Sequence, residues 1–396
     1  MPSLRLSVMR GTDQDMAFLR LVLTEFEARH HVTVDLIFLE WQTAWPQILN
    51  YATYGDSPDI SLVGTTWITP LSGMQVLRPF SDAEARPYSD GVCLASAWNA
   101  GTIARRNWAL PWQVDTRVIY YWRSALKRAG IEEATAFSTF EAVEDTVRTL
   151  TANGQRAIVT PTVASTDTLH SIAGWIWSAG GDFLSLDGKR VLFDEPQALA
   201  AIQRYYQLHR SLAGSTLVSL NESQADRAFV DGDAAIIISG PWIIDGVTEY
   251  RPTALDDLGI AAIPGTPYNG GSSFVIWRRS LQELAALDLI HFLMSRDIQK
   301  RMSRLFGQLP VRMDILTEVE SNQNRFFRVL SSNALKGRAL PTGRLWGIVE
   351  ERLVQTLGTI WKDVLDPSQP AELNDVISTP LIRLAAQLNA TLGYSA

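Results

Sequence analysis

The sequence has few of the features that link a chain to nucleic acids, membranes or disulfide-rich folds. The formal net charge of its 396 residues is -7, and its basic residues are spread along the chain, whereas binding to DNA or RNA needs a basic face. No stretch approaches about 18 uninterrupted apolar residues, so no transmembrane helix is expected. Cys93 is the only cysteine, which excludes an intramolecular disulfide and a thiolate metal cluster.

Motifs of catalysis and cofactor binding are also missing. The sequence has no G-x-S-x-G elbow, no G-x-x-x-x-G-K-[ST] phosphate loop, and no G-x-G-x-x-G after an expected strand. Its five histidines are scattered. The adjacent His30 and His31 follow an expected helix, where complementing the helix dipole is favoured over metal binding. We therefore expect no catalytic residue, no metal site and no cofactor.

The sequence does contain a regular alternation of strand and helix signals. Strands are expected over 4–9, 32–41 and 58–64, with helices over 16–30 and 45–55 between them. This order predicts a parallel sheet with right-handed crossovers. With 46% hydrophobic residues and a length beyond that of one hydrophobic core, the chain is expected to fold into two lobes.

Loops that leave the carboxyl ends of parallel strands form the binding edge of such a sheet. The polar and aromatic residues expected at this edge are Asp13, Gln14, Glu40, Trp41, Thr66 and Trp67.

A second binding edge is expected at the segment FVDGDAAIIISGPW, residues 229–242. Ala234 to Ile238 suits a buried strand. Gly240 and Pro241 end it, because glycine frees the backbone and proline lacks a donor. Trp242 would then stand at the carboxyl mouth of a central strand. A core tryptophan that closes the end of the sheet is the alternative.

Tryptophan is unusually abundant, with 13 residues, and several lie close to charged residues in the sequence. An apolar ring beside a carboxylate suits a sugar, which has C–H-rich faces and hydroxyl edges. Core packing is the alternative for each ring. The groupings are Trp112 with Asp115, Trp175 and Trp177 with Asp182, Trp242 with Asp245, and Arg344 with Trp346.

The ordered segments of the chain resemble the family of extracellular solute-binding proteins that serve ABC-type sugar importers. The segment at 229–242 is similar to a F-x-x-G-x-A-A-M-x-x-x-G-x-W block of that family, with isoleucine in place of methionine. The other similar segments are SPDISLVG, ALPWQVDTRVIYYWRSALKRAGI, GWIWSAGGDFLSLDGKRVLFDEPQALAAIQRYYQLH and FLMSRDIQKRMSRLFGQLPVR.

The resemblance implies an α/β, two-lobed periplasmic-binding-protein-like fold of type II. Each lobe would be a mostly parallel sheet flanked by helices, with the ligand cleft between the lobes. The N-terminal lobe would comprise 1–111 and 262–312, and the C-terminal lobe 112–261 and 313–396. Hinge crossovers are expected near 110–116, 259–264 and 310–316.

The resemblance also implies roles for individual residues. Trp242 matches a stacking tryptophan and Trp346 a late stacking aromatic. Asp115 and Glu40 match acidic ligand contacts, and Asp13 matches a polar one. Thr66 and Trp67 replace the charged pair of maltodextrin binders, so the ligand is expected to differ in size or polarity. The full set of expected ligand contacts is Asp13, Gln14, Glu40, Trp41, Trp67, Trp112, Asp115, Trp175, Trp177, Trp242, Arg344 and Trp346.

The implied function is non-catalytic capture of a sugar, with a di- or oligosaccharide favoured, for the membrane permease subunits of an ABC importer. The expected state is a monomer without nucleic-acid partners. The first residues lack the apolar core of a signal peptide, so a periplasmic or extracellular location, with a lipoprotein anchor possible, supposes that a signal was removed. Two alternatives are a carbohydrate-active enzyme that uses Glu40, Asp115 and Asp182, and a binding protein for a polyol, peptide or organic anion.

Overall fold

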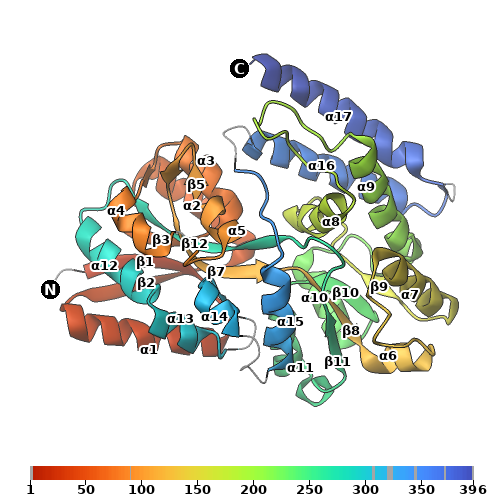
Figure 1. Ribbon diagram of the computed structural model, residues 1–396, viewed down its shortest axis with the longest axis horizontal. Coiled ribbons are helices and arrows are strands. Elements are labelled where there is room, and N and C mark those ends of the chain that lie inside the picture. The colour runs from red at the N-terminus through yellow and green to blue at the C-terminus, as the bar shows by residue number, and fades with distance from the viewer. Residues whose placement is uncertain are drawn as a thin grey trace. The chain divides into compact units, whose positions relative to one another are not determined.

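The computed structural model describes residues 3–89, 91–305, 308–318, 324–342, 346–369 and 372–394 (Figure 1). The chain divides into two compact units. Unit 1 comprises Met1–Asp115, Asn269–Ser331 and Thr342–Arg344, and unit 2 comprises Thr116–Tyr268, Ser332–Pro341 and Leu345–Ala396. The lobes and hinges expected from the sequence stay a prediction.

Unit 1 combines one large sheet with helices; the boundary with unit 2 falls within β7 and within α15. Its strands are β1 (Ser3–Met9), β2 (Thr33–Leu39), β3 (Ile60–Gly64), β4 (Leu77–Arg78), β5 (Thr102–Ile103), β6 (Arg106–Asn107), β7 (Leu110–Thr116), β12 (Asn269–Trp277) and β13 (Leu309–Pro310). Its helices are α1 (Asp13–His30), α2 (Trp41–Tyr54), α3 (Ile68–Gly73), α4 (Asp82–Ala85), α5 (Ala95–Ala100), α12 (Glu283–Leu293), α13 (Arg296–Met302), α14 (Met313–Leu316) and α15 (Arg325–Ala334), with the 3₁₀ turns η1 (Thr65–Trp67) and η2 (Arg86–Tyr88).

The sheet of unit 1 has the strand order β13-β7-β12-β3-β1-β2, and β4 pairs with β12. β1 runs parallel to β2 and to β3, which confirms the parallel arrangement expected for the first three strands. β12 runs antiparallel to β3 and β4, and β13 antiparallel to β7. The sheet is therefore mixed, whereas the sequence favoured a mostly parallel one. The difference arises from β12, which follows the segment Thr116–Tyr268 of unit 2 in the chain and joins the sheet antiparallel to β3 and β4.

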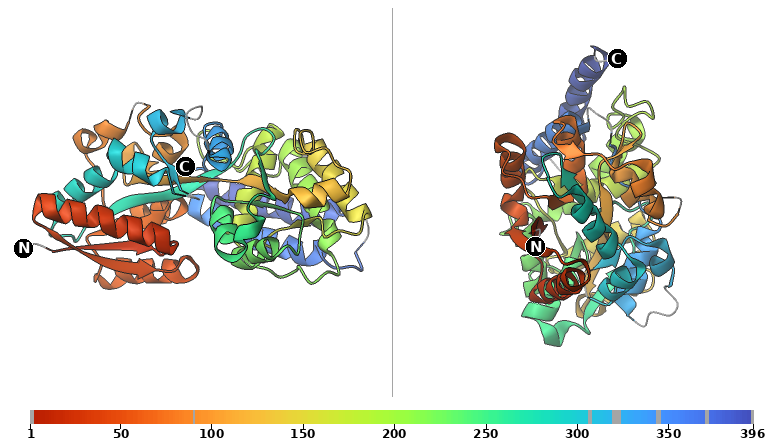
Figure 2. Two further views of the ribbon diagram at one scale, coloured as in Figure 1. Left: turned by 90° about the horizontal axis from the view of Figure 1, so that it is seen from below. Right: turned by 90° about the vertical axis from the view of Figure 1, so that its left-hand side faces the viewer.

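Helices cover both faces of this sheet. Figure 1 shows α1 and α13 on one side of the strands and α2 and α3 on the other, and the left view of Figure 2 shows α1 alongside β1 and β2. The core under α2 and α3 contains the fully buried Ala44, Ile48, Ile68, Val63 and Val275. These apolar contacts fix the helices that follow β2 and β3, and thus the residues at the ends of those strands.

The second helix begins earlier than the sequence indicated. The expected strand 32–41 ends at Leu39, and α2 starts at Trp41 instead of residue 45. The Thr43 amide donates to the Glu40 carbonyl at 2.9 Å, which starts the first helical turn there. Glu40 and Trp41 consequently lie at the junction of strand and helix.

Unit 2 has a smaller sheet and longer helices. Its strands are β8 (Val118–Trp122), β9 (Ile158–Val159), β10 (Ile236–Ser239) and β11 (Leu258–Ala261). Its helices are α6 (Arg123–Arg128), α7 (Phe140–Ala152), α8 (Thr166–Ser178), α9 (Pro196–Leu208), α10 (Glu222–Asp231), α11 (Trp242–Tyr250), α16 (Trp346–Val364) and α17 (Asn374–Tyr394), with the 3₁₀ turns η3 (His209–Leu212) and η4 (Pro252–Ala254).

The strand order of the second sheet is β11-β8-β10-β9, so β10 is an interior strand. β10 is parallel to β9, whereas β8 is antiparallel to both β10 and β11. This sheet is also mixed, because β8 enters it from unit 1 in the opposite direction to β10. The carboxyl end of β10 therefore meets the amino end of β8, where Ser239 pairs with Val118.

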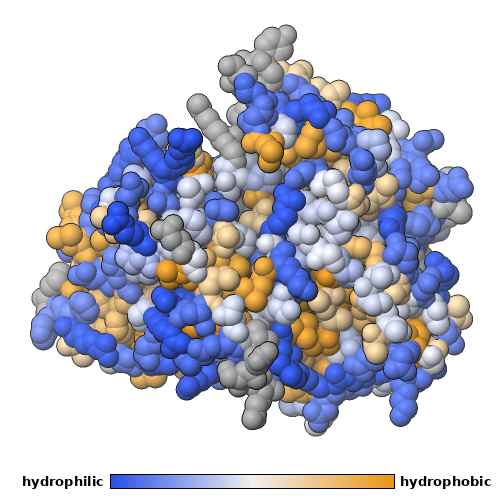
Figure 3. Space-filling view, in the orientation of Figure 1, coloured by the Kyte–Doolittle hydropathy of each residue, from blue (hydrophilic) through white to orange (hydrophobic). Residues whose placement is uncertain are grey.

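The long helices of unit 2 pack around aromatic side chains. The fully buried Trp361 of α16 contacts Tyr205 and Tyr206 of α9 at centroid distances of 6.0 and 4.6 Å. No helix among the described residues is long and apolar enough to cross a membrane. On the face drawn in Figure 3, hydrophilic side chains predominate, and hydrophobic ones lie in small groups among them.

Candidate functional site

The first candidate region is the edge of unit 1 at which β1, β2 and β3 end. Because these strands are parallel, their carboxyl ends meet there. Arg10 follows β1, and its Nε lies 2.9 Å from Oε1 of Glu40, which follows β2. Both side chains are more than half exposed. The edge thus presents an ion pair to solvent.

A cluster of three tryptophans includes Trp41, the residue that follows Glu40 in the chain. Trp67 ends the turn after β3, and its ring centroid lies 5.5 Å from that of Trp41 and 5.5 Å from that of Trp45. Trp41 is 45% exposed. Gly64 lies under the rings, since a Cβ there would be 3.4 Å from Cζ3 of Trp41. The result is an aromatic surface with one open ring beside a carboxylate.

The residues after β1 form the start of α1. Asp13 and Gln14 occupy its first turn and are exposed. Asp15, which the sequence analysis did not single out, fixes this turn: its Oδ2 accepts from the amide and the hydroxyl of Thr12 at 2.9 and 2.8 Å. Burial raises the pKa of Asp15. Thr12 and Asp15 thus form a capping box at the start of α1, which fixes the positions of Asp13 and Gln14 in its first turn.

Trp112 and Asp115 lie further along the same sheet, on β7. Trp112 is buried, with its ring centroid 5.3 Å from that of Phe274. Oδ1 of Asp115 accepts from the Gly270 amide at 3.2 Å. At Gly271 a Cβ would lie 2.1 Å from the Gln113 carbonyl oxygen. Both expected contacts thus adjoin a close approach of β7 and β12.

The second candidate region is the carboxyl end of β10 in unit 2. The strand ends at Ser239, and Trp242 is the first residue of α11. A Cβ at Gly240 would lie 2.1 Å from Cζ3 of Trp242. Glycine is therefore required for the ring to lie against the backbone. The location of Trp242 just past an interior strand agrees with the sequence analysis.

Trp242 is held by charged groups on other elements. Its Nε1 donates to Oδ2 of Asp226 on α10 at 2.6 Å, and the Ser239 hydroxyl donates to Oδ1 of the same carboxylate at 2.8 Å. The guanidinium carbon of Arg117 lies over the Trp242 ring, 4.7 Å from its centroid. Burial raises the pKa of Asp226 to about 6, against the opposing effects of these hydrogen bonds and of Arg117. Trp242 as a whole residue is partly exposed.

Arg117, between β7 and β8, is itself buried and surrounded by acids. Its Nη2 lies 3.5 Å from Oδ1 of Asp167 and 3.4 Å from Oε1 of Glu222. The same nitrogen lies 3.3 Å from Nδ1 of His170, whose ring stacks on Tyr268 at 4.2 Å. Burial, together with Arg117, lowers the pKa of His170 to about 3, so this histidine is neutral at physiological pH.

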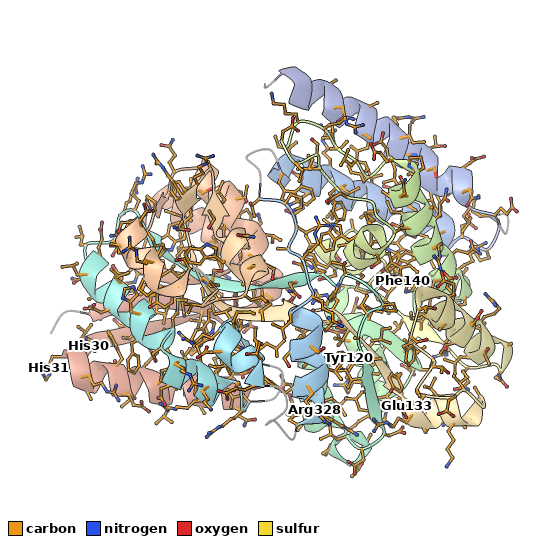
Figure 4. The ribbon with its side chains drawn as sticks, in the orientation of Figure 1. His30, His31, Tyr120, Glu133, Phe140 and Arg328 are labelled. Carbon is orange, nitrogen blue, oxygen red and sulfur yellow. The ribbon has the colours of Figure 1, made fainter. Side chains whose placement is uncertain are left out.

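Tyr120, on β8 and labelled in Figure 4, is fully buried near this network. Burial and the charges of Asp245 and Asp226 raise its pKa well above the ordinary value. Arg117 and Asp226 were not among the candidate residues expected from the sequence. The one local signal is an arginine directly before the apolar run of residues 118–122.

The remaining expected residues of unit 2 lie in two other surroundings. Trp175 is buried against Phe140, with ring centroids 4.2 Å apart. Trp177 donates from Nε1 to Oδ1 of Asp182 at 3.1 Å, and Oδ2 of Asp182 accepts from Arg338 at 2.8 Å. Asp182 also accepts from its neighbouring backbone amide at 2.8 Å. Both of its oxygens are thus engaged in fixing the turn.

Trp346, at the start of α16, is 2% exposed and packs edge-on against Phe183, with ring centroids 5.8 Å apart. Arg344 lies outside the described residues. The structure therefore places Glu40, Trp41 and Trp67 together in unit 1. In unit 2, Trp242 contacts Arg117 and Asp226, whereas Trp177 and Trp346 both pack against Phe183. Which of them contact a ligand stays a prediction.

Metal binding finds no support in the described parts of the chain. Within residues 3–89, 91–305, 308–318, 324–342, 346–369 and 372–394, no group of three or more His, Cys, Asp or Glu side chains is placed to hold a metal ion.

The comparison with protein families matches residues 22–327 to the family described as bacterial extracellular solute-binding protein. The chain belongs to this family. The diacetylchitobiose binding protein DasA of Streptomyces coelicolor is 20% identical over 309 residues, which cover 75% of this chain and 71% of that protein. The resemblance noted in the sequence is thereby confirmed.

Solved structures of the same kind share the fold. A solute-binding protein of an ABC transporter from Thermotoga lettingae, bound with α-D-tagatose, matches with a TM-score of 0.84 and 18% identity, covering 99% of this chain and 100% of that chain. Maltose-bound MalE3 of T. maritima matches with a TM-score of 0.82 and 19% identity, covering 99% and 100%. These likenesses confirm the expected α/β fold of periplasmic binding proteins.

Proposed function

We propose that this protein is the carbohydrate-binding component of an ABC-type importer, which captures a sugar without converting it chemically. The observation that carries the proposal is Trp242, a partly exposed residue just past the end of an interior strand, with a carboxylate on its indole nitrogen. A ring face beside polar acceptors suits the C–H-rich face and hydroxyl edge of a pyranose. A di- or oligosaccharide is favoured over a monosaccharide.

The family and its relatives support this substrate class. DasA is named for diacetylchitobiose, and the two solved structures contain tagatose and maltose. In this role the protein would be a monomer located in the periplasm or outside the cell, with permease subunits as its partners. Ligand capture would occur by hinged closure of two lobes. Closure would make the liganded form the one that the permease recognises.

The proposed contacts include Trp242 in unit 2 and, separately, residues at the strand-end edge of unit 1. There, Trp41 and Trp67 offer ring faces and Glu40 a carboxylate. Charge-assisted hydrogen bonds from sugar hydroxyls to such a carboxylate are about twice as strong as neutral ones. The other expected contacts, which we also propose, are Asp13, Gln14, Trp112, Asp115, Trp175, Trp177, Arg344 and Trp346.

Calorimetric titration with D-tagatose, maltose, diacetylchitobiose and acarbose tests the proposal. We expect saturable binding at micromolar sugar, which corresponds to about -8 kcal/mol, and no product by chromatography. Trp242→Ala should weaken the affinity about 30-fold or more, as for a central aromatic anchor. Tyr250→Ala is the matched control, because Tyr250 ends the same helix and is 53% exposed.

Three results would contradict the proposal. Turnover of a glycoside would indicate an enzyme. If none of the four sugars binds, a non-sugar solute becomes the better assignment. Equal affinity of Trp242→Ala and wild type, with a large loss of thermal stability in the variant, would make Trp242 a core residue.

A further inference from the structure

We propose that Arg117 is a positioning residue for ligand binding, which holds the Trp242 ring in one orientation together with Asp226. The inference rests on the proposed function, because it assigns the ring to a sugar. It goes further in naming two residues, neither of them among the expected ligand contacts, on which the affinity depends.

Three elements restrain the Trp242 ring. Arg117, from the β7–β8 junction, lies over the ring at 4.7 Å from its centroid. Asp226, from α10, accepts the indole N–H at 2.6 Å and so fixes the rotation of the ring. Gly240, from the end of β10, lets the six-membered ring approach the backbone. A ring restrained in this way loses little conformational freedom when a ligand binds, which improves affinity.

Arg117 is itself immobilised, so it can act as a fixed support. Asp167 of α8 and Glu222 of α10 both lie within 3.5 Å of its Nη2. The guanidinium also lies 5.8 Å from the ring centroid of Tyr268. Only 5% of Arg117 is exposed. Arg117 therefore supports the ring from within the protein.

The planar shape of the guanidinium is essential to this role. Arginine stacks on an aromatic face while it pairs with acids in its plane, whereas lysine carries a point charge on a flexible stem. Arg117→Lys therefore keeps the charge among the acids and removes the flat support. Asp226→Asn keeps the side-chain shape and removes the charge that attracts the indole N–H.

The chain provides a matched control on the surface of the same unit. Arg227 lies over the Tyr250 ring at 4.4 Å and pairs with Asp231 at 2.7 Å. This arrangement repeats the arginine–aromatic–aspartate chemistry at an exposed position. Arg227→Lys and Asp231→Asn therefore report the effect of losing such contacts away from the proposed site.

The test is a double-mutant cycle on sugar affinity. Arg117→Lys is titrated by calorimetry with maltose, diacetylchitobiose, D-tagatose and acarbose, in the wild-type and the Trp242→Ala backgrounds. We expect about a tenfold loss of affinity in the wild-type background and less than about twofold in the Trp242→Ala background, as for coupled neighbours. Arg227→Lys should change the affinity less than about twofold.

A loss of the same size in both backgrounds would overturn the inference, because Arg117 would then act independently of the ring. Unchanged affinity in Arg117→Lys would overturn it as well. If Arg117→Lys does not fold, Asp226→Asn is titrated in the same two backgrounds instead, with Asp231→Asn as its control. The same two results would then overturn the inference.

A readout that needs no ligand separates this inference from the proposed function. In protein labelled with 5-fluorotryptophan, the ¹⁹F resonance missing in Trp242→Phe belongs to Trp242. We expect Arg117→Lys to shift or broaden that resonance, and an unchanged resonance would overturn the inference. A shifted resonance with a silent sugar panel would support the positioning role and contradict the sugar assignment.

Discussion

Both units carry a tryptophan beside a carboxylate at the end of a strand, but the two surroundings differ. In unit 1, Trp41 is 45% exposed and rests on other rings, and Glu40 pairs with Arg10 in solvent. In unit 2, Trp242 is fixed by a buried guanidinium and by a carboxylate on its N–H. The Trp41 ring is exposed and packs on another ring, whereas a hydrogen bond and a guanidinium orient the Trp242 ring.

The difference follows from solvation. An exposed ion pair is screened and contributes little to stability, about 0–1 kcal/mol. A buried charge is costly unless it is paired and hydrogen-bonded, so Arg117 is held among Asp167, Glu222 and His170. The unit 2 site therefore has the more rigid geometry. We expect it to contribute more to affinity than the unit 1 edge.

Among the substitutions considered below, Gly240→Ala is expected to lower the sugar affinity most. A Cβ at this position would lie 2.1 Å from the Trp242 ring, so the ring must move. We expect sugar affinity to fall about 30-fold, since displacing a central aromatic anchor costs about 2 kcal/mol. Calorimetry measures the loss. Gly73→Ala is the control, because a Cβ there meets nothing within 4 Å. Equal affinities of Gly240→Ala and Gly73→Ala would contradict the importance assigned to the orientation of the Trp242 ring.

A buried acid of unit 2 should make stability depend on pH. Burial raises the pKa of Glu350 on α16 from 4.5 to about 8. Between these values the folded state keeps the proton and the unfolded state releases it, so ionisation reduces wild-type stability as pH rises and has its full effect above about pH 8. Glu350→Gln lacks this loss. We expect its advantage to grow by on the order of 1 kcal/mol per pH unit across that window.

Urea unfolding at several pH values measures this difference between Glu350→Gln and the wild type. Other titrating groups cancel in the subtraction. A difference that stays constant from pH 5 to pH 8 would show that Glu350 ionises in the folded protein as it does in water.

Trp41→Ala should have a smaller effect on affinity. Trp41 is 45% exposed, and its substitution retains the neighbouring Trp67 ring. We therefore expect about a three- to tenfold loss of sugar affinity with little change in melting temperature. Tyr54→Ala is the control, because Tyr54 ends the same helix and is 79% exposed. A loss of affinity as large as that of Trp242→Ala would contradict the ranking of the two units.

The smallest effect on stability is expected from Glu40→Gln. Its partner Arg10 is 55% exposed, so loss of the pair should cost less than about 1 kcal/mol and vanish in high salt. Urea unfolding at low and high salt measures it, with Asp231→Asn as another exposed pair for comparison. A loss of more than about 2 kcal/mol would indicate that the edge of unit 1 is buried in solution.

The sequence was sufficient to place the first three strands and the tryptophan at the end of β10, because these depend on local periodicity and on the Gly-Pro pair. It did not reveal the support of that ring. Arg117 contacts Glu222 across a separation of 105 residues, and no local pattern encodes such a contact. The mixed pairing of the sheets was missed for the same reason, since β8 and β12 join their sheets through long-range contacts.

The most direct test is intrinsic fluorescence during titration with maltose and diacetylchitobiose, compared between the wild type and Trp242→Phe. If the ring contacts the sugar, the wild type shows a saturable change at micromolar concentrations and the variant shows a much weaker one. Identical curves for the two proteins would contradict the account, because the signal and the affinity would then arise from other residues.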